Sequence, residues 1–333
     1  MRQQPIHDSN PTTGDGIFGL PHRAAEALVH LVPVPFEATV SYRTGTINGP
    51  QGIREASTQV DLLDPDVGRP HRCGVWQHPE SSQVRRWSDE ARRGDARIKN
   101  RIGDQLNTWL ADKVEAALED GRIVGVIGGD HSVPFAAIQA HARRSPGMGI
   151  LHFDAHFDLR EAYEGCTWSH ASVMHNVLTR VPEVAKIVAV GVRDYCDEED
   201  AMVRKSKGRV VPFLDADLRD AQMQGQPFTV QAKRIAEALP RNVYVSFDID
   251  GLDPFLCPNT GTPVPGGLSF QQACAVLNAV VSSGRRIVGF DLVEVAPAEG
   301  DGEWNANVGA RVLYKLIGAT LRTRIVALSP ARS

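Results

Sequence analysis

The segment Asp154-Ala155-His156-Phe157-Asp158 strongly limits how this chain can fold. Two carboxylates and an imidazole occupy every second position, directly after the apolar run 148–153, which predicts a buried strand. Unpaired carboxylates are too costly to desolvate in such a place. They become tolerable there if a divalent cation neutralises them. The segment therefore predicts a strand that ends in a metal site.

Short apolar runs alternate with helical patterns along most of the chain. The expected strands are 28–34, 74–78, 123–127, 148–153, 187–190, 243–247, 287–290 and 324–328. The expected helices are 51–57, 102–118, 132–143, 228–238, 269–282 and 305–322. Residues 80–98 are charged and lack periodicity, so they predict a surface loop. This alternation predicts a parallel sheet covered by helices on both faces.

The chain has 333 residues, of which 42% are hydrophobic, enough for one large α/β domain or two ordinary ones. No shift in composition after residue 20 marks a linker, so we predict a single domain over residues 21–333. Residues 1–20 are mostly polar and predict a flexible tail. They contain no apolar signal-peptide core, so the cytoplasm is the default location.

Charge and cysteine content exclude several classes of protein. The formal net charge of -4 gives no indication of a nucleic-acid or membrane-surface partner. No apolar run approaches the roughly 20 residues of a membrane span. The five cysteines are odd in number and form no C-x-x-C pair, so we expect reduced thiols rather than disulfides or a zinc ribbon.

Four of the expected strands end in ionisable residues. The carboxyl ends of parallel strands meet at one edge of a sheet, where binding sites form. Three of these ends supply the candidate metal ligands, which are His131, Asp154, His156, Asp158, Asp248 and Asp250. Four crowded carboxylates would repel one another and take up protons, so we predict two divalent cations.

The ligand types indicate which metals and which chemistry to expect. Mixed oxygen and nitrogen donors favour Mn²⁺, and Ni²⁺, Co²⁺, Fe²⁺ and Zn²⁺ accept the same set. The set contains no cysteine, which argues against structural zinc. A solvent molecule between two such ions becomes a hydroxide near neutral pH, and the reaction that follows is hydrolysis.

Single residues in these motifs have simpler interpretations. His131 alone could be an ordinary loop histidine, and Asp248 with Asp250 could form a turn or a helix cap. We interpret His152, inside its strand, as structural and Asp130 as a residue that orients a ligand. The occurrence of six ligand types at three strand ends favours the two-metal site.

Three motifs resemble the metal-binding signatures of the ureohydrolase family, which includes arginase, agmatinase and formimidoylglutamase. They are GGDHS at 128–132, DAHFD at 154–158 and SFDIDGLDP at 246–254. The resemblance runs from about Leu28 to the C-terminus. It implies a three-layer α/β/α fold with a mainly parallel eight-stranded sheet. It also implies a binuclear centre, usually of manganese, and a homo-oligomer, either a trimer or a hexamer.

The resemblance also implies roles for individual residues. His131 and Asp158 would bind one metal, His156 and Asp250 the other, with Asp154 and Asp248 as bridges. His170 matches a proton shuttle toward the leaving amine, and a loop histidine near the metals is also a reasonable general acid. Glu294 matches the glutamate that binds the guanidinium, because a carboxylate can pair with two of its N–H groups. The simpler interpretations are a surface histidine and a structural carboxylate.

The expected reaction is attack of a metal-held hydroxide on a guanidinium carbon, with release of urea and an amine or ammonia. The segment 260–267 resembles agmatinases, whereas 170–173 departs from their usual His-Gly-Thr-Pro. The segment 34–42, which contains Thr39, resembles a branch that includes guanidine hydrolases, some of which use nickel. Trp304 could pack on a guanidinium or belong to the core. Thr39 and Trp304 are therefore candidate substrate contacts.

The sequence leaves several substrates open. We expect a small guanidine, free or alkyl-substituted, followed by agmatine or a guanidino acid, with formimidoylglutamate more distant. The non-enzymatic alternatives are an inactive partner subunit of a hetero-oligomer and a regulatory guanidine-binding protein. The complete ligand set argues against the inactive subunit.

Overall fold

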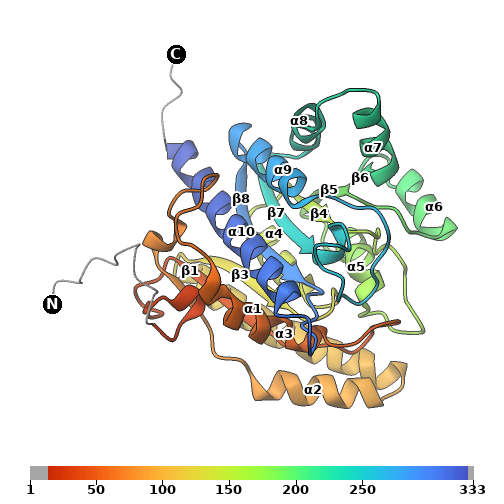
Figure 1. Ribbon diagram of the computed structural model, residues 1–333. Coiled ribbons are helices and arrows are strands. Elements are labelled where there is room, and N and C mark those ends of the chain that lie inside the picture. Colours follow the sequence, from red (N-terminus) through yellow and green to blue (C-terminus); the bar gives the residue numbers. More distant parts are fainter. Residues whose placement is uncertain (1–13, 329–333) are drawn as a thin grey trace.

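The computed structural model describes residues 14–328 of the chain. The strands are β1 (Val29–Val34), β2 (Val75–Gln77), β3 (Ile123–Gly128), β4 (Met148–Phe153), β5 (Val184–Val190), β6 (Val210–Phe213), β7 (Asn242–Asp248) and β8 (Arg286–Val293). They form one eight-stranded sheet in the order β2-β1-β3-β8-β7-β4-β5-β6 (Figure 1). Every neighbouring pair is parallel.

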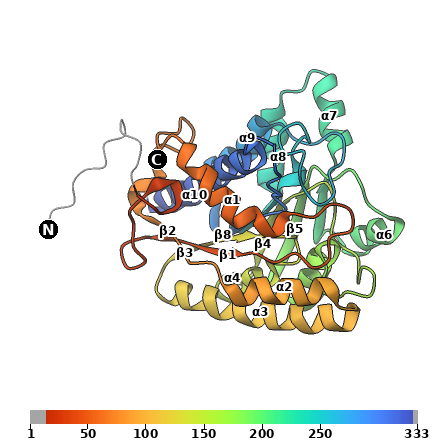
Figure 2. The same ribbon diagram turned by 60° about the horizontal axis from the view of Figure 1, so that its bottom comes forward.

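Helices cover both faces of this sheet. They are α1 (Gly49–Ala56), α2 (Ser82–Arg93), α3 (Ala96–Glu119), α4 (Phe135–Arg144), α5 (Val173–Arg180), α6 (Asp197–Lys205), α7 (Asp215–Met223), α8 (Phe228–Ala238), α9 (Phe270–Ser282) and α10 (Trp304–Leu328). Helices α2, α3 and α4 lie on one side of the sheet and α1, α9 and α10 on the other (Figure 2). The predicted α/β/α fold is confirmed.

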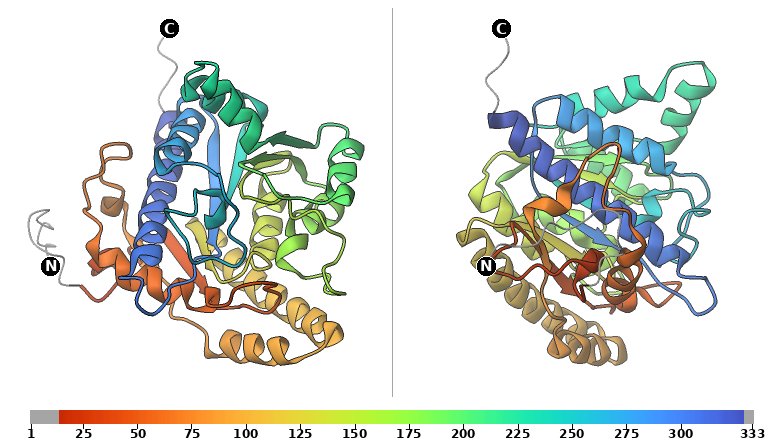
Figure 3. Two further views of the ribbon diagram at one scale, coloured as in Figure 1. Left: turned by 45° about the vertical axis from the view of Figure 1, so that its right-hand side comes forward. Right: turned by 60° about the vertical axis from the view of Figure 1, so that its left-hand side comes forward.

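The buried strands divide their side chains between the two faces. In β4, Leu151 and Phe153 join the apolar cluster that includes α8, α9 and α10, whereas Met148 and Ile150 join the cluster of α4 and α5. Alternate residues of a strand point to opposite faces, so a strand covered on both sides has to be apolar throughout. Helices α9 and α10 lie side by side over their face (Figure 3). Within the described part of the chain, every helix is too short or too polar to cross a membrane.

Two predicted elements were wrong. Residues 80–98 are not a loop, because α2 and the start of α3 occupy them. Only a narrow face of α2, with Val84, Ser88 and Ala91, is buried, and charged residues around it obscure the helical period. The predicted strand at 324–328 is the end of α10. Strand β6 and helices α5, α6 and α7 were not predicted.

The expectation of a flexible tail over residues 1–20 was wrong for its last part. Ile17, Phe18 and Leu20 are each 1% exposed and belong to the core. Phe18 packs edge-on against Tyr314 with ring centroids 4.9 Å apart, and its backbone N–H donates to Ser57 Oγ at 2.7 Å. These three apolar residues in a polar context were the missed signal. Residues 1–13 and 329–333 lie outside the described residues.

Candidate metal centre

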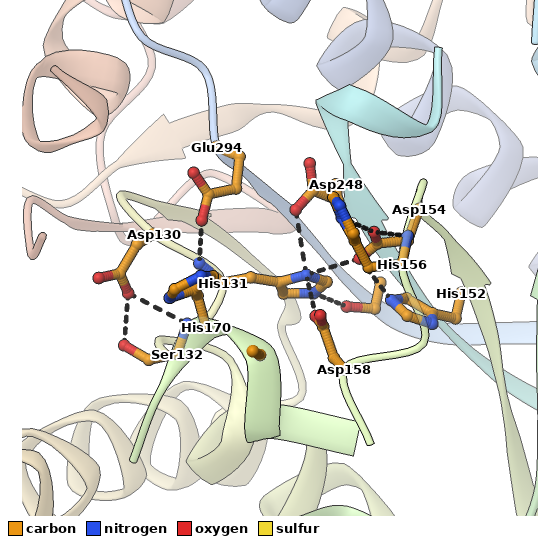
Figure 4. Close-up of polar contacts among 12 residues, drawn as sticks. Asp130, His131, Ser132, His152, Asp154, His156, Asp158, His170, Asp248 and Glu294 are labelled. Carbon is orange, nitrogen blue, oxygen red and sulfur yellow. Dashed lines mark hydrogen bonds and ion pairs between the residues drawn. The ribbon is translucent and has the colours of Figure 1, made fainter. Parts of the chain in front are cut away.

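The four strands that carry the motifs are the four central neighbours of the sheet, in the order β3-β8-β7-β4. His131 follows β3, Glu294 follows β8, and Asp154 follows β4. Asp248 ends β7, where it pairs in register with Val293 of β8. The parallel order therefore brings these side chains to one edge of the sheet, where they point toward one another (Figure 4).

His131 lies among three carboxylates. Its Nδ1 is 3.0 Å from Asp154 Oδ2, 3.0 Å from Asp158 Oδ2 and 3.2 Å from Asp248 Oδ2. All four side chains are buried. Nonetheless His131 Nδ1 and Asp158 Oδ2 have no hydrogen-bond partner among the described residues. Buried polar atoms normally find partners, so these two atoms fit a site that a cation completes.

A second group of donors shares one carboxylate with the first. His156 Nδ1 lies 3.3 Å from Asp154 Oδ1 and 3.3 Å from Asp250 Oδ2. The candidate ligand atoms of Asp154, His156 and Asp250 lie within 4.8 Å of one another, as do those of His131, Asp154 and Asp158. Asp154 is common to both, as expected of a bridge. Asp248 lies on the His131 side, and its predicted bridging role, like the assignment of each ligand to one ion, stays a prediction.

Backbone N–H groups fix the orientation of three carboxylates. Asp154 Oδ1 accepts from the N–H of His156 at 2.6 Å, and Asp248 Oδ1 accepts from that of Asp250 at 2.8 Å. Asp250 Oδ1 accepts from the N–H of Ala155 at 2.9 Å. In each residue the other oxygen lies among the donors of the cluster. For Asp154 and Asp248 the N–H donor lies two residues further along the same motif, so the spacing of these motifs orients the ligands as well as supplying them.

A buried hydrogen-bond chain behind His131 was missed from the sequence. His131 Nε2 lies 3.0 Å from Ser246 Oγ, which donates to Asp291 Oδ1 at 3.0 Å. Since a carboxylate only accepts, the single hydroxyl proton is used on Asp291, and Ser246 accepts from the Nε2–H of His131. His131 Nδ1 is thereby directed to the carboxylate cluster, where a metal ion could take the place of its proton.

The protonation of the cluster points to the same conclusion. Burial lowers the pKa of His131, but the three carboxylates outweigh burial and hold this pKa well above its usual value. Burial and the charge of Asp154 raise the pKa of Asp158 to about 6. Burial and the charge of Asp250 raise the pKa of Asp248 well above its usual range. Protons thus occupy the cluster where divalent cations would otherwise neutralise it.

His152, which we interpreted as structural, contacts a candidate ligand directly. The ring is fully buried, and its Nε2 lies 2.8 Å from Asp154 Oδ2. It also belongs to one of the His and Asp groups that could hold an ion, together with His131, Asp154 and Asp158. The alternation of 154, 156 and 158 extends back to 152, which is the signal that could have identified it.

His170 lines the cavity beside the cluster, and Thr39 lies behind it. Thr39 Oγ1 accepts from the backbone N–H of His170 at 3.1 Å and lies 3.1 Å from its Nδ1. The same hydroxyl is 3.4 Å from Asp130 Oδ2, which also accepts the backbone N–H of Ala38 at 2.9 Å. Thr39 is buried, and the structure gives it a contact with His170; its predicted contact with substrate stays a prediction.

Glu294 joins the cluster through the backbone of His131. Its Oε1 accepts from the N–H of His131 at 2.8 Å, and its backbone adopts a left-handed conformation with φ of 64°. Oε2 is buried and has no hydrogen-bond partner in the described range. Burial and the charge of Asp130 raise the pKa of Glu294 well above its usual range. An arriving cation that donates to Oε2 would satisfy this oxygen and hold it ionised.

Trp304 does not belong to the core, and its predicted contact with substrate stays a prediction. It is 48% exposed, so it is not part of the core, and it does not line the cavity beside the metal ligands. Its indole N–H donates to the carbonyl of Phe255 at 3.4 Å.

The cavity has a volume of about 310 Å³ and opens directly on the cluster. The ligands His156 and Asp158 and the candidate shuttle His170 form part of its wall. The other lining residues are Ser41, Tyr42, Arg160, Tyr163, Ala171, Asp194, Tyr195, Glu199, Thr262, Pro263 and Val264. A small molecule in this cavity would contact both the metal ligands and His170.

Comparison with known proteins gives one consistent result. Residues 27–318 match the arginase family. An N(1)-aminopropylagmatine ureohydrolase of Synechocystis sp. is 31% identical over 300 residues, which cover 88% of this chain and 89% of that protein. An agmatinase of Bacillus anthracis is also 31% identical, over 82% of this chain and 84% of its own.

Solved structures agree with these relatives. A hypothetical agmatinase from Burkholderia thailandensis has a TM-score of 0.75 and 25% identity, and the match covers 93% of this chain and 91% of the other. An arginase from Medicago truncatula has a TM-score of 0.70 and 26% identity, over 89% and 88% of the two chains. The resemblance in the three motifs thus extends over the whole fold.

Proposed function

The chain belongs to the arginase family, and on this premise we propose that it cleaves a C–N bond of a small guanidino compound, releasing urea with ammonia or an amine. The observation that carries the proposal is the convergence of buried imidazole and carboxylate groups, with His131 Nδ1 3.0 Å from both Asp154 Oδ2 and Asp158 Oδ2, and with Asp154 shared with a second group that contains His156 and Asp250. An inactive partner subunit would have no need of a complete set of ligands.

Two divalent ions would be held by His131 and Asp158, by His156 and Asp250, and by the shared Asp154 and Asp248. The donors are imidazole nitrogens and carboxylate oxygens, which favours Mn²⁺ and also accepts Ni²⁺. Bound there, the ions would supply a hydroxide nucleophile at neutral pH.

The chain's own residues bind the substrate and move the proton. Glu294 Oε2 accepts N–H groups of the guanidinium, since this oxygen is buried and lacks another partner. His170, on the cavity wall, delivers a proton to the leaving amine. Thr39 fixes the His170 ring through Nδ1, which leaves Nε2 available for that transfer.

The proposal also covers the substituent that the guanidino group of the substrate carries and the oligomeric state of the protein. The relatives are named for agmatine and aminopropylagmatine, whereas the segments 34–42 and 170–173 favour a small guanidine. A homo-oligomer, either trimer or hexamer, and a cytoplasmic location remain predictions.

A urea-release assay tests the proposal. Metal-free protein is loaded separately with Mn²⁺ and Ni²⁺ and then given guanidine, methylguanidine, dimethylated biguanides, agmatine, guanidinobutyrate and arginine; formimidoylglutamate is assayed separately for formamide, because its hydrolysis yields no urea. We expect metal-dependent urea release from at least one guanidino compound and its near-complete loss in His156→Ala. No urea from any of them, or full activity in His156→Ala, would refute the proposal.

A further inference from the structure

One cation lies on the cavity wall with no assigned role. Arg160 follows the candidate ligand Asp158 by two residues, and its backbone N–H donates to the carbonyl of Ala171 at 3.1 Å. Its guanidinium carbon lies 5.4 Å from the ring centre of Tyr163. That ring packs edge-on against His170, with centroids 5.5 Å apart. Arg160 and the proposed proton donor are thus separated by a single aromatic ring.

The hydrogen-bonding capacity of Arg160 is unused. Its Nε lies 3.7 Å from Oε2 of Glu199, which is close enough for an ion pair but beyond hydrogen-bond distance. Both oxygens of Glu199 already accept backbone N–H groups, from Leu159 at 3.0 Å and from Cys196 at 3.1 Å. Among residues 14–328, the Arg160 guanidinium therefore makes no hydrogen bond, although it offers five donors.

The position of Arg160 suits it to bind a ligand. The side chain is 39% exposed, so its charge is only partly screened by solvent. Stacking on Tyr163 restricts the flat guanidinium, and its forked donors match the two oxygens of a carboxylate. Free guanidine would fill only part of the 310 Å³ cavity and would leave Arg160 without a partner.

Building on the proposed function, we propose that Arg160 binds the carboxylate of a guanidino carboxylic acid whose guanidino group lies at Glu294 and the metal centre. Such a substrate carries opposite charges at its two ends, and the two ends of the site carry the complementary charges. An ammonium tail, as in agmatine, would be repelled by Arg160. Two carboxylates also line the cavity: Glu199, whose oxygens both accept backbone N–H groups, and Asp194, which is exposed, so that its charge is screened more strongly.

Three substrates that differ mainly in the charge of the tail test this assignment. They are 4-guanidinobutyrate (anionic), n-butylguanidine (neutral) and agmatine (cationic), each assayed for urea with the Mn²⁺-loaded enzyme. The variants are Arg160→Met, which keeps an apolar stem without charge, and Asp194→Asn as the matched control on the same cavity.

We expect the wild type to prefer 4-guanidinobutyrate. Arg160→Met should lower kcat/KM for that substrate by about 10- to 100-fold, the loss of a charge-assisted hydrogen bond, and leave n-butylguanidine nearly unchanged. An equal loss for all three substrates would assign Arg160 a structural role and overturn the inference. A wild-type preference for agmatine that Asp194→Asn removes would also overturn it.

The neutral substrate separates this inference from the proposed function. Urea released from n-butylguanidine without any preference for the anionic tail would overturn the carboxylate assignment alone. No urea from any of the three compounds would overturn both.

Discussion

Replacing Ser246 with Ala tests the hydrogen-bond chain that aims His131 at the metal site. Ser246 is fully buried in β7, accepts from His131 Nε2 at 3.0 Å and donates to Asp291 Oδ1 at 3.0 Å. Removing its hydroxyl leaves an imidazole N–H and a buried carboxylate without this partner. Each such group costs about 1–3 kcal/mol, so the free energy of unfolding of the metal-free protein should fall by at least that amount.

The larger effect should be on metal binding. Without Ser246, nothing fixes the His131 tautomer with its lone pair on Nδ1, and affinity for one ion should fall by about 10- to 100-fold. Calorimetric titration with Mn²⁺ measures the affinity, and denaturation followed by circular dichroism measures stability. Ser283→Ala is the matched control, because Ser283 is exposed at the end of α9 and its hydroxyl donates to the Val280 carbonyl of the same helix. Wild-type Mn²⁺ affinity and stability in Ser246→Ala would refute the reasoning.

Three further predictions concern the same site. Gly261→Ala would place a Cβ 2.7 Å from Oε2 of Glu294, so kcat/KM should fall by at least about 10-fold while Mn²⁺ binding persists; unchanged steady-state kinetics would contradict this. Thr39→Val should lower kcat and alter its pH profile, and Thr39→Ser should restore both, because the hydroxyl positions His170; equal activity of the two variants would exclude that role. The pKa of Asp158 is raised to about 6 in the fold, so protonation of this carboxyl stabilises the metal-free protein below pH about 4. This stabilisation is lost as the pH rises through about 6. Since metal needs the carboxylate, Mn²⁺ should raise the Tm more above pH 6 than below it, and a pH-independent shift would contradict this.

The central strands could be predicted well because short, continuous apolar runs are typical of buried strands in a parallel sheet. Strand β6 was missed because it is short, lies at the sheet edge and contains Pro212. Helix α2 was missed because charged residues surround its narrow apolar face. The buried residues Ile17 to Leu20 were assigned to a tail because their contacts, such as that with Tyr314, lie almost 300 residues away along the chain.

The candidate ligands could be predicted because their strand ends become neighbours once the sheet is parallel. The supporting residues could not. The role of Ser246 depends on which face of β7 it occupies and on Asp291 in the adjacent strand. The contact of buried Thr39 with His170 joins residues 131 positions apart, so it could not be predicted without the fold. Trp304 has an amphipathic helical context in sequence but is half-exposed in the structure.

The central claim is that the buried His and Asp cluster binds two divalent ions and thereby hydrolyses a guanidino group. The most direct measurement is urea release as a function of Mn²⁺ bound per chain, with metal content determined on the same samples. The account predicts that metal-free protein releases no urea and that activity rises until two ions are bound per chain. Full activity without bound metal, or no urea from any guanidino compound at two ions per chain, would contradict it.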